Sequence, residues 1–255
     1  IDTDHVLRVL QPIWAERTET ANRVRGRVEA VLDWAAAWGL RAGANPARWR
    51  GHLDKLLPAR SRVQRVTHHA ALPYADMPAF MQSLREQSGL AARGLELQIL
   101  TAARSGEVLG ATWDEFQLKA GLWVVPATRM KARREHRVAL SSPALSLLDR
   151  LRETATGEHV LPGRRQGAPL SNMAFAQLLR RMGHDDITAH GFRSSFRDWV
   201  AEQTTYPREL AEMALAHVIS DKVEAAYRRG DMLQRRHAMM EDWARFCQGT
   251  DAAPG

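Results

Sequence analysis

The sequence predicts a mainly α-helical protein, in which a small helical domain precedes a larger helical domain with an inserted small antiparallel β-sheet. Apolar residues recur at helical spacing from the start of the chain, and this spacing is lost between Ala59 and Pro73. Short runs typical of strands follow between Trp113 and Leu140, among further helical segments. We therefore predict a first domain at residues 1–64, a linker at 65–74 and a second domain at 75–255.

The first domain is expected to contain three helices. Thr3 or Asp4 can cap the first helix, Thr20 can cap the second, and Asn45-Pro46 can open the third. The residues predicted to face the core are Val6, Leu7, Leu10, Ile13, Trp14, Val24, Val28, Val31, Leu32, Ala35, Trp49, Leu53, Leu56 and Leu57. The residues predicted to form an outward basic face are Arg23, Arg25, Arg27, Arg48, Arg50 and Lys55. Such a face binds phosphate or is merely solvated, and the sequence leaves both interpretations open.

The second domain is predicted to be helical on both sides of its sheet. The segments expected to be helical begin near Pro78, Leu90, Ser105, Ser142 and Ser171, with Ser105 and Ser171 as caps, and about four more helices occupy 188–248. The stretches 113–116, 122–126 and 137–140 are predicted to be strands. The polar stretch 128–136, which contains Lys131, is expected to be the turn between the last two strands.

Charge and composition favour a nucleic-acid partner. Lys and Arg number 36 against 29 Asp and Glu, which gives a formal net charge of +7. Because the guanidinium fork binds phosphate in a bidentate manner, the arginine excess favours nucleic acid, although codon usage in a GC-rich genome would produce the same excess. The single cysteine, Cys247, excludes an internal disulfide and is typical of a reducing cytosol.

The sequence contains no segment that predicts a membrane protein. No apolar run approaches the ~20 residues needed to span a bilayer, and the beginning of the chain does not resemble a signal peptide. Because the chain begins at Ile1 without a methionine, we expect it to be a fragment of a longer protein.

Six residues have side chains suited to phosphoryl transfer on a polyanion. They are Arg104, Lys131, His190, Arg193, His217 and Tyr227. His190 and Arg193 are three residues apart, so on a helix they would share one face. Each residue alone has an ordinary structural explanation, since a histidine or tyrosine on an apolar helix is commonly part of the packing. Tyr227, however, is the one tyrosine among three that is followed by two arginines.

The combination of these residues resembles the tyrosine recombinase family, and within it the integrases of prophages and genomic islands. The matching stretches are 101–108 (TAARSGEV), 130–140 (MKARREHRVAL), 189–194 (AHGFRS), 215–217 (LAH) and 226–229 (AYRR). The resemblance extends from about Leu72 to Phe246, and the first domain looks like the core-binding domain of the family. All six positions are filled with residues of the family type, in the family order.

The resemblance implies a covalent mechanism. Tyr227 would attack a scissile phosphodiester and form a 3′-phosphotyrosyl bond with release of a 5′-hydroxyl, so that resealing needs no ATP. Arg104 and Arg193 would bind the non-bridging oxygens, whose negative charge grows in the transition state. Glu107 is expected to orient Arg104.

The remaining three residues would supply hydrogen bonds and proton transfer. By the same resemblance, His217 would donate a hydrogen bond to the phosphate, Lys131 would be the general acid for the leaving 5′-oxygen, and His190 would assist deprotonation of the tyrosine. The sequence lacks paired carboxylates at metal-site spacing, so we expect no metal and no cofactor and predict activity in chelator.

The predicted function is that of a site-specific DNA recombinase (integrase) that integrates or excises a mobile element. Its expected partners are double-stranded DNA at an attachment or core site, other copies of the chain in a homotetramer on DNA, a directionality factor and a host DNA-bending protein. We expect it in the bacterial cytoplasm, associated with the nucleoid when bound. Integrases of this kind carry a further N-terminal domain for arm-type sites, and this chain starts too late to include it.

Three alternatives remain open from the sequence. A type IB topoisomerase uses the same chemistry without exchanging strands between duplexes. A DNA-binding fragment with an inactive catalytic site, or a basic helical regulator, would not use Tyr227. For the last segment, Met232–Phe246, the resemblance suggests packing on a neighbouring protomer, whereas the sequence equally allows packing on its own domain.

Overall fold

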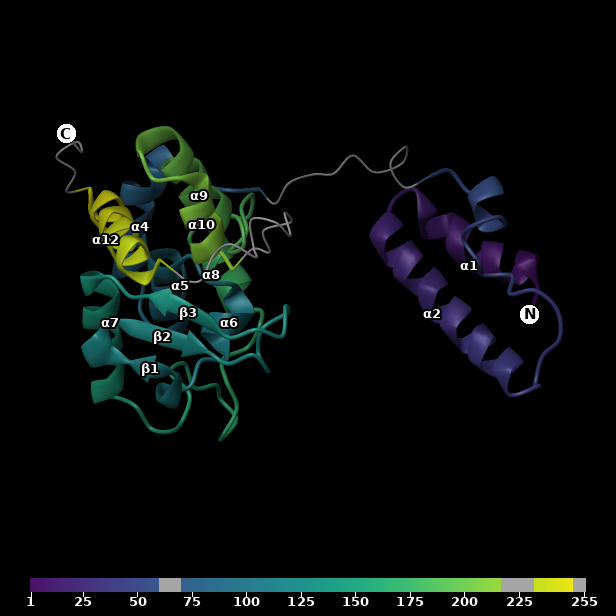
Figure 1. The fold of residues 1–255 in the computed structure, drawn as a ribbon, viewed down its shortest axis with the longest axis horizontal. Coiled ribbons are helices and arrows are strands. Elements are labelled where there is room, and N and C mark those ends of the chain that lie inside the picture. Colours follow the sequence, from purple (N-terminus) through teal and green to yellow (C-terminus); the bar gives the residue numbers. More distant parts are fainter. Residues whose placement is uncertain (60–69, 217–231, 250–255) are drawn as a thin grey trace. The chain divides into compact units, whose positions relative to one another are not determined.

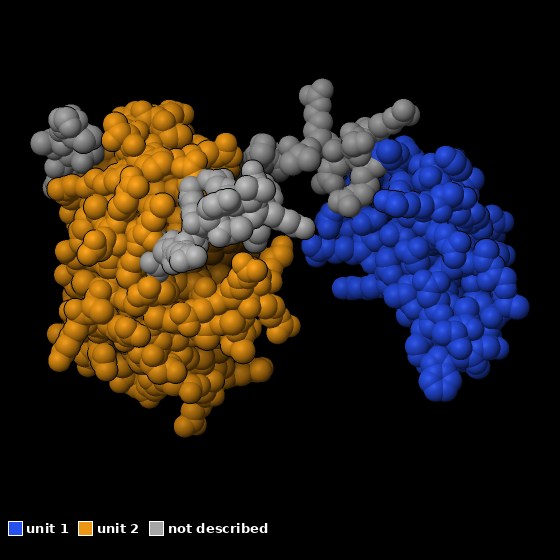
Figure 2. Space-filling view, viewed as in Figure 1, with its two compact units in different colours: residues 1–68 blue, residues 69–255 orange. Residues whose placement is uncertain are grey.

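The computed structural model describes residues 1–59, 70–216 and 232–249 (Figure 1). The chain divides into two compact units, residues 1–68 and residues 69–255 (Figure 2). Both units are mainly helical, and the second contains a small antiparallel sheet, so the predicted fold class is confirmed. In the part of the chain that the structure describes, no helix has the length and apolarity that a bilayer crossing requires.

The first unit is built on two antiparallel helices, α1 (Thr3–Trp14) and α2 (Thr18–Ala37). The buried residues that form its core are Val6, Leu10, Trp14, Ala21, Leu32, Ala47, Leu53 and Leu57. The Trp14 ring stacks on Trp49 with 5.4 Å between the ring centroids. Its Nε1 donates to the carbonyl of Pro58 at 2.9 Å. The chain that follows α2 is thereby held across the helix pair.

The predicted third helix of this unit does not form. Residues 45–52 are turns, and only a short 3-10 helix, η1 (Leu53–Lys55), follows. The cause lies in Asn45, whose amide donates to the carbonyl of Glu29 at 2.8 Å and whose Oδ1 accepts from the backbone of Ala47 at 2.9 Å. Asparagine side chains compete in this way with helical backbone bonds. The segment is anchored to α2 rather than coiled on itself.

Five local predictions in the first unit were also wrong. Asp2 caps α1 by accepting from the backbone of His5, and α2 begins at Thr18 without a cap from Thr20. Arg25 does not face outward, because it donates to the carbonyl of Ala47 at 2.9 Å and pairs with Glu29 at 2.5 Å. Val31 and Leu56, both predicted to face the core, are 63% and 48% exposed. The second half of α2 therefore presents an apolar side chain to solvent.

The second unit packs its helices around α5 (Leu90–Thr101), in which nine of the twelve residues are buried. The other described α-helices of this unit are α4 (Met77–Glu86), α6 (Ser105–Leu109), α7 (Ser142–Glu153), α8 (Ala174–Arg181), α9 (Phe192–Gln203), α10 (Arg208–Ala214) and α12 (Leu233–Gln248), and its 3-10 helices include η2 (Tyr74–Asp76) and η4 (Leu118–Ala120). Two predicted caps were wrong, because α6 is capped at Arg104 instead of Ser105, and α8 begins only at Ala174. Ser171 accepts instead from the backbone of Met173 at 3.2 Å.

The sheet has three antiparallel strands in the order β1 (Phe116–Gln117), β2 (Leu122–Val125) and β3 (His136–Ala139). β2 and β3 pair from Leu122 with Ala139 to Val125 with His136, so residues 126–135 connect them and include Lys131, as predicted. Most of the stretch predicted as the first strand is instead the 3-10 helix η3 (Trp113–Glu115). Glu115 of this helix is buried and accepts from the indole of Trp123 at 2.8 Å.

Helix α12 packs on its own unit. Met240 and Trp243 are buried, and the indole of Trp243 donates to the carbonyl of Ile99 in α5 at 2.8 Å. The Trp243 ring also lies against Phe196 and Trp199 of α9. Of the two interpretations of this segment, the structure therefore shows intramolecular packing. The helix fixes the end of the described chain close to α5 and β3.

Candidate active site

Arg104 lies at the start of α6 and is held by Glu107. The backbone N–H of Arg104 donates to Glu107 Oε2 at 2.9 Å, and its Nη1 donates to Glu107 Oε1 at 2.8 Å. The contact predicted between these two residues is therefore present. Ala102, with φ of 50°, ends α5 and turns the chain so that Arg104 leaves the core. The side chain of Arg104 remains 28% exposed, which leaves it accessible to a ligand.

Arg193, the second residue of α9, is buried. It is 3% exposed, and its Nη1 and Nη2 donate to the carbonyls of Ala102 and Leu215, the latter at 2.6 Å. Burial, assisted by the nearby charge of Arg104, lowers the pKa of Arg193 to about 10. Arg193 therefore stays protonated at neutral pH, and its position is fixed by the backbone on two sides.

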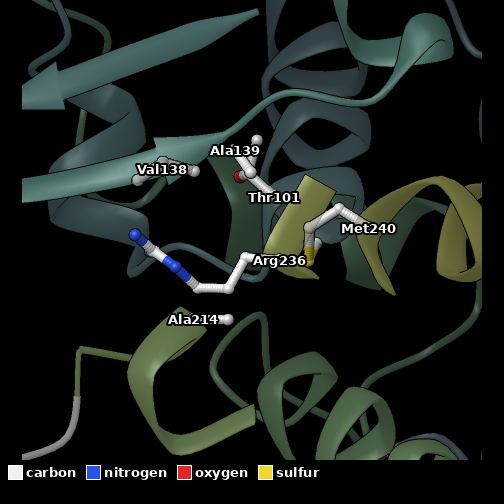
Figure 3. Close-up of a pocket in the computed structure, with 6 residues that line it drawn as sticks. All are labelled: Thr101, Val138, Ala139, Ala214, Arg236 and Met240. Carbon is white, nitrogen blue, oxygen red and sulfur yellow. The ribbon is translucent and has the colours of Figure 1, made fainter. Parts of the chain in front are cut away.

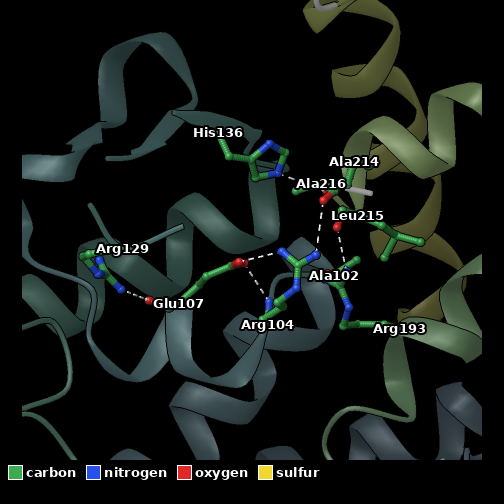
Figure 4. Close-up of polar contacts among 9 residues, drawn as sticks. All are labelled: Ala102, Arg104, Glu107, Arg129, His136, Arg193, Ala214, Leu215 and Ala216. Atoms are coloured by element: carbon green, nitrogen blue, oxygen red, sulfur yellow. Dashed lines mark hydrogen bonds and ion pairs between the residues drawn. The ribbon is translucent and has the colours of Figure 1, made fainter. Parts of the chain in front are cut away.

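The two arginines converge on one turn after α10. Leu215 accepts from Arg193, and the next carbonyl, that of Ala216, accepts from Arg104 Nη2 at 3.1 Å (Figure 4). Ala216 has a φ of 50°, which lies in the left-handed region. Two guanidinium groups from separate helices thus lie together directly before residue 217. This is an arrangement that can bind a phosphate group by several charge-assisted hydrogen bonds.

The connection between β2 and β3 is anchored to α6. Arg129 forms an ion pair with Glu115 and donates to the backbone carbonyl of Glu107. Lys131 follows two residues later and is exposed. Because Glu107 also holds Arg104, the base of this connection and the first arginine are positioned by the same residue.

His190 lies in a turn before α9 and is exposed, so the prediction that it shares a helix face with Arg193 was wrong. The turn is closed by Gly191, whose N–H donates to the carbonyl of Thr188 at 2.9 Å. A β-carbon at Gly191 would lie 2.3 Å from the carbonyl oxygen of Ala70. The backbone of residues 70–71 therefore lies directly against this turn.

The structure therefore brings Arg104 and Arg193 together and places Lys131 and His190 on exposed turns of the same unit. The predicted residues His217 and Tyr227 lie outside the described residues. Within the described ranges, no three His, Cys, Asp or Glu side chains gather closely enough to hold a metal ion.

Sequence reasoning missed His136 and Arg236, which contact the same region. His136 Nε2 bonds to the carbonyl of Ala214 at 3.2 Å, and Arg236 is 2% exposed. A signal for His136 was present, because in a strand it lies on the same face as Val138, which is buried. No sequence signal distinguished Arg236 from the exposed Arg235 beside it.

Two family models match the chain. The phage integrase central domain matches residues 1–52, and the phage integrase family matches residues 71–233. The second match covers more than half of the chain. The protein therefore belongs to the phage integrase family.

The chain is also similar to individual integrases. It is 34% identical to prophage integrase IntZ of Escherichia coli K12 over 242 residues, which cover 94% of this chain and 58% of IntZ. The chain thus spans little more than half the length of this relative. Its fold matches that of a lambda integrase dimer bound to a COC′ core site, with a TM-score of 0.62, 20% identity, and coverage of 88% of this chain and 81% of that one. It also matches a lambda integrase tetramer bound to a Holliday junction, with a TM-score of 0.61, 17% identity, and coverage of 91% and 65%.

Proposed function

We propose that this chain is the DNA-binding and catalytic part of a site-specific DNA recombinase. It cleaves and rejoins strands through a 3′-phosphotyrosyl intermediate to integrate or excise a mobile element. The observation that carries the proposal is the convergence of Arg104 and Arg193 on the consecutive carbonyls of Leu215 and Ala216. Membership of the phage integrase family supports it.

The two arginines bind the scissile phosphate. Their N–H groups donate to neutral carbonyls of Ala102, Leu215 and Ala216. A phosphate offers charged acceptors, whose hydrogen bonds to guanidinium are roughly twice as strong as neutral ones. Contacts within the protein orient both side chains, so little reorganisation is needed when negative charge grows in the transition state.

The chemical step is a transesterification. The Tyr227 oxygen forms a bond to phosphorus while the bond from phosphorus to the 5′-oxygen breaks. The proton of the tyrosine passes towards His190, and Lys131 protonates the leaving 5′-oxygen. His217 donates a hydrogen bond to the phosphate. Exposure of Lys131 and His190 on turns is consistent with groups that meet their substrate only when DNA is bound.

The DNA partner is a duplex attachment or core site. Residues 1–64 form the core-site DNA-binding domain, 65–74 the linker and 75–255 the catalytic domain, which together enclose the duplex. We also propose a homotetramer on DNA, with a directionality factor and a host DNA-bending protein as further partners. The likeness to the lambda integrase tetramer on a Holliday junction supports the homotetramer and neither of the two accessory proteins. The protein acts in the bacterial cytoplasm, on the nucleoid.

The test is trapping of the covalent intermediate. Nicked suicide DNA that carries the crossover sequence flanking the encoding element is incubated with the chain in EDTA, and SDS-resistant adducts are resolved on a gel. The unaltered chain is expected to form an adduct and Tyr227→Phe none, because the variant lacks the nucleophilic oxygen.

The other outcomes identify what is wrong. An adduct that persists in Tyr227→Phe means that another residue is the nucleophile. Salt-sensitive DNA binding without any adduct identifies a DNA-binding fragment without an assembled site. Relaxation of plasmids that lack the site identifies topoisomerase activity instead. A requirement for Mg²⁺ would contradict the metal-free mechanism.

A further inference from the structure

Two consecutive residues of β3 hold both flanks of the segment 217–231. His136 Nε2 lies 3.2 Å from the carbonyl of Ala214, the last residue of α10. A carbonyl only accepts hydrogen bonds, so Nε2 carries the proton. The carbonyl of Arg137 in turn accepts from Nη1 of Arg236, in the first turns of α12, at 2.5 Å. The chain is thus fixed to the same strand both before residue 217 and after residue 231.

The Arg236 contact is buried. Arg236 is 2% exposed, and Figure 3 shows its side chain between Val138 of β3 and Ala214 of α10. The other residues around it are Thr101, Ala139 and Met240. Burying a guanidinium group costs free energy that an apolar side chain of similar length would avoid. What the arginine adds over such a side chain is a directed hydrogen bond to β3.

The His136 contact extends the arginine site. Ala214, Leu215 and Ala216 present three consecutive carbonyls to His136, Arg193 and Arg104 (Figure 4). The turn that holds the two proposed phosphate ligands is therefore itself fixed to β3. One histidine thereby links the sheet to the arginine pair.

His136 is neutral in these surroundings. The charged groups that face it are Arg236 from α12 and Arg104 and Glu107 from α6. Burial, followed by the charge of Arg236, lowers the pKa of His136 to about 4. The single Nε2–H donor is therefore present throughout the neutral pH range.

We propose that His136 and Arg236 are positioning residues for strand cleavage, which fix to β3 both flanks of the segment that carries the proposed nucleophile. The inference rests on the proposed function, because it concerns attack by Tyr227. Attack on phosphorus requires the oxygen to approach within about 3–3.5 Å in line, and a displacement of about 1 Å can cost about 100-fold in rate. Loss of either contact leaves DNA binding intact and slows cleavage.

The experiment measures single-turnover adduct formation on the suicide DNA, together with DNA affinity. His136→Phe keeps a ring and removes the donor, whereas His136→Gln places an amide N–H near the position of Nε2. Arg236→Met keeps the stem and removes the fork, and Arg235→Met is the matched control at the exposed neighbouring position. We expect His136→Phe and Arg236→Met to slow the adduct about tenfold or more at nearly unchanged affinity. His136→Gln is expected to restore most of the rate of adduct formation, and Arg235→Met to form the adduct as fast as the unaltered chain.

A second substrate separates the nucleophile from the general acid. A 5′-bridging sulfur is a leaving group with a much lower pKa than an alcohol and needs no proton. This substrate is expected to rescue Lys131→Ala but neither His136→Phe nor Arg236→Met. Rescue of the last two would show that the contacts act on the β2–β3 connection, which would overturn the proposal.

Two further results would overturn it. One is an unaltered adduct rate in both His136→Phe and Arg236→Met, and the other is a rate in His136→Gln as low as that of the Phe variant. If the Phe variant does not fold, His136→Asn replaces it, because its shorter amide does not reach Ala214. Failure of the proposed function is recognised separately, since the unaltered chain would then form no adduct dependent on Tyr227.

Discussion

Arg104 shows how the geometry of a single side chain limits what can replace it. Its Nη1 donates to Glu107 while its Nη2 donates to Ala216, and these acceptors come from parts of the chain more than a hundred residues apart. The rigid guanidinium fork serves both acceptors in one plane, whereas a lysine ammonium is a single point donor on a flexible stem. A lysine at this position would keep the charge without fixing the turn.

His136 makes the stability of the second unit depend on pH. Its pKa is about 4 in the folded chain against 6.5 in the unfolded one, so the unfolded chain binds more protons between these values. The contribution of neutral His136 is fully present above pH 6.5 and is lost as pH falls towards 4. Between pH 6.5 and 5 the free energy of unfolding is expected to fall by on the order of 2 kcal/mol through this residue.

Urea unfolding at several pH values checks this prediction. His136→Gln keeps a donor but does not titrate, so its free energy of unfolding should vary less over the same window. Carboxylates that titrate in this range are common to both proteins and cancel in the difference. Equal pH dependence in the two proteins would mean that His136 is not shielded as the structure indicates.

At the residue scale, the sequence predicted residue types better than contacts. Arg104 and Glu107 were paired correctly because they are close in the chain. Arg193 donates to the carbonyls of Ala102 and Leu215, 91 and 22 residues away along the chain, and Arg236 donates to that of Arg137, 99 residues away. Every residue has a carbonyl, so no side-chain pattern in the sequence could identify these acceptors.

At the scale of elements, the helices and the hairpin followed from periodicity, and the two misses involve side chains that bond to another element. Asn45 replaced a predicted helix with turns by binding α2. Glu115 drew its segment into a 3-10 helix by accepting from Trp123. Both contacts depend on a second element that local sequence does not reveal. Propensity and spacing describe an element in isolation, and tertiary hydrogen bonds override them.

The turn before α9 provides a prediction at this scale. A β-carbon at Gly191 would meet the backbone of Ala70 at 2.3 Å and that of Ala71 at 2.8 Å, and neither can move as a side chain would. Gly191→Ala is therefore expected to lower the free energy of unfolding by about 1–3 kcal/mol. It should also slow adduct formation, because His190 is the preceding residue.

Gly26→Ala is the matched control for Gly191→Ala. Gly26 lies inside α2, and nothing lies within 4 Å of its added β-carbon. The same chemical change should there stabilise the helix by up to about 1 kcal/mol. Thermal unfolding distinguishes the two, and a Gly191→Ala protein as stable as the unaltered chain would contradict the close approach of the 70–71 segment to α9.

At the scale of the whole molecule, the two units have separate cores. The buried cluster of the first unit lies within residues 6–57, and that of the second within residues 72–247. Each unit is therefore expected to fold alone as residues 1–68 and 69–255. If both bind one DNA site, the covalent connection makes the second binding event intramolecular, which typically raises affinity by about 10²–10⁴.

Fluorescence anisotropy on duplex DNA that contains the core site tests this expectation for the intact chain, each piece, and the equimolar mixture of pieces. The intact chain should bind about 100-fold more tightly than either piece. Its dependence on salt should approach the sum of the two separate dependences, since each neutralised phosphate contributes a slope of about −0.9. If the second unit alone binds DNA as tightly as the intact chain, the first unit does not bind DNA, and the two units do not act together on the duplex. If the mixture of pieces binds as tightly as the intact chain, the covalent connection does not raise the affinity, and the units meet on DNA by contacts of their own.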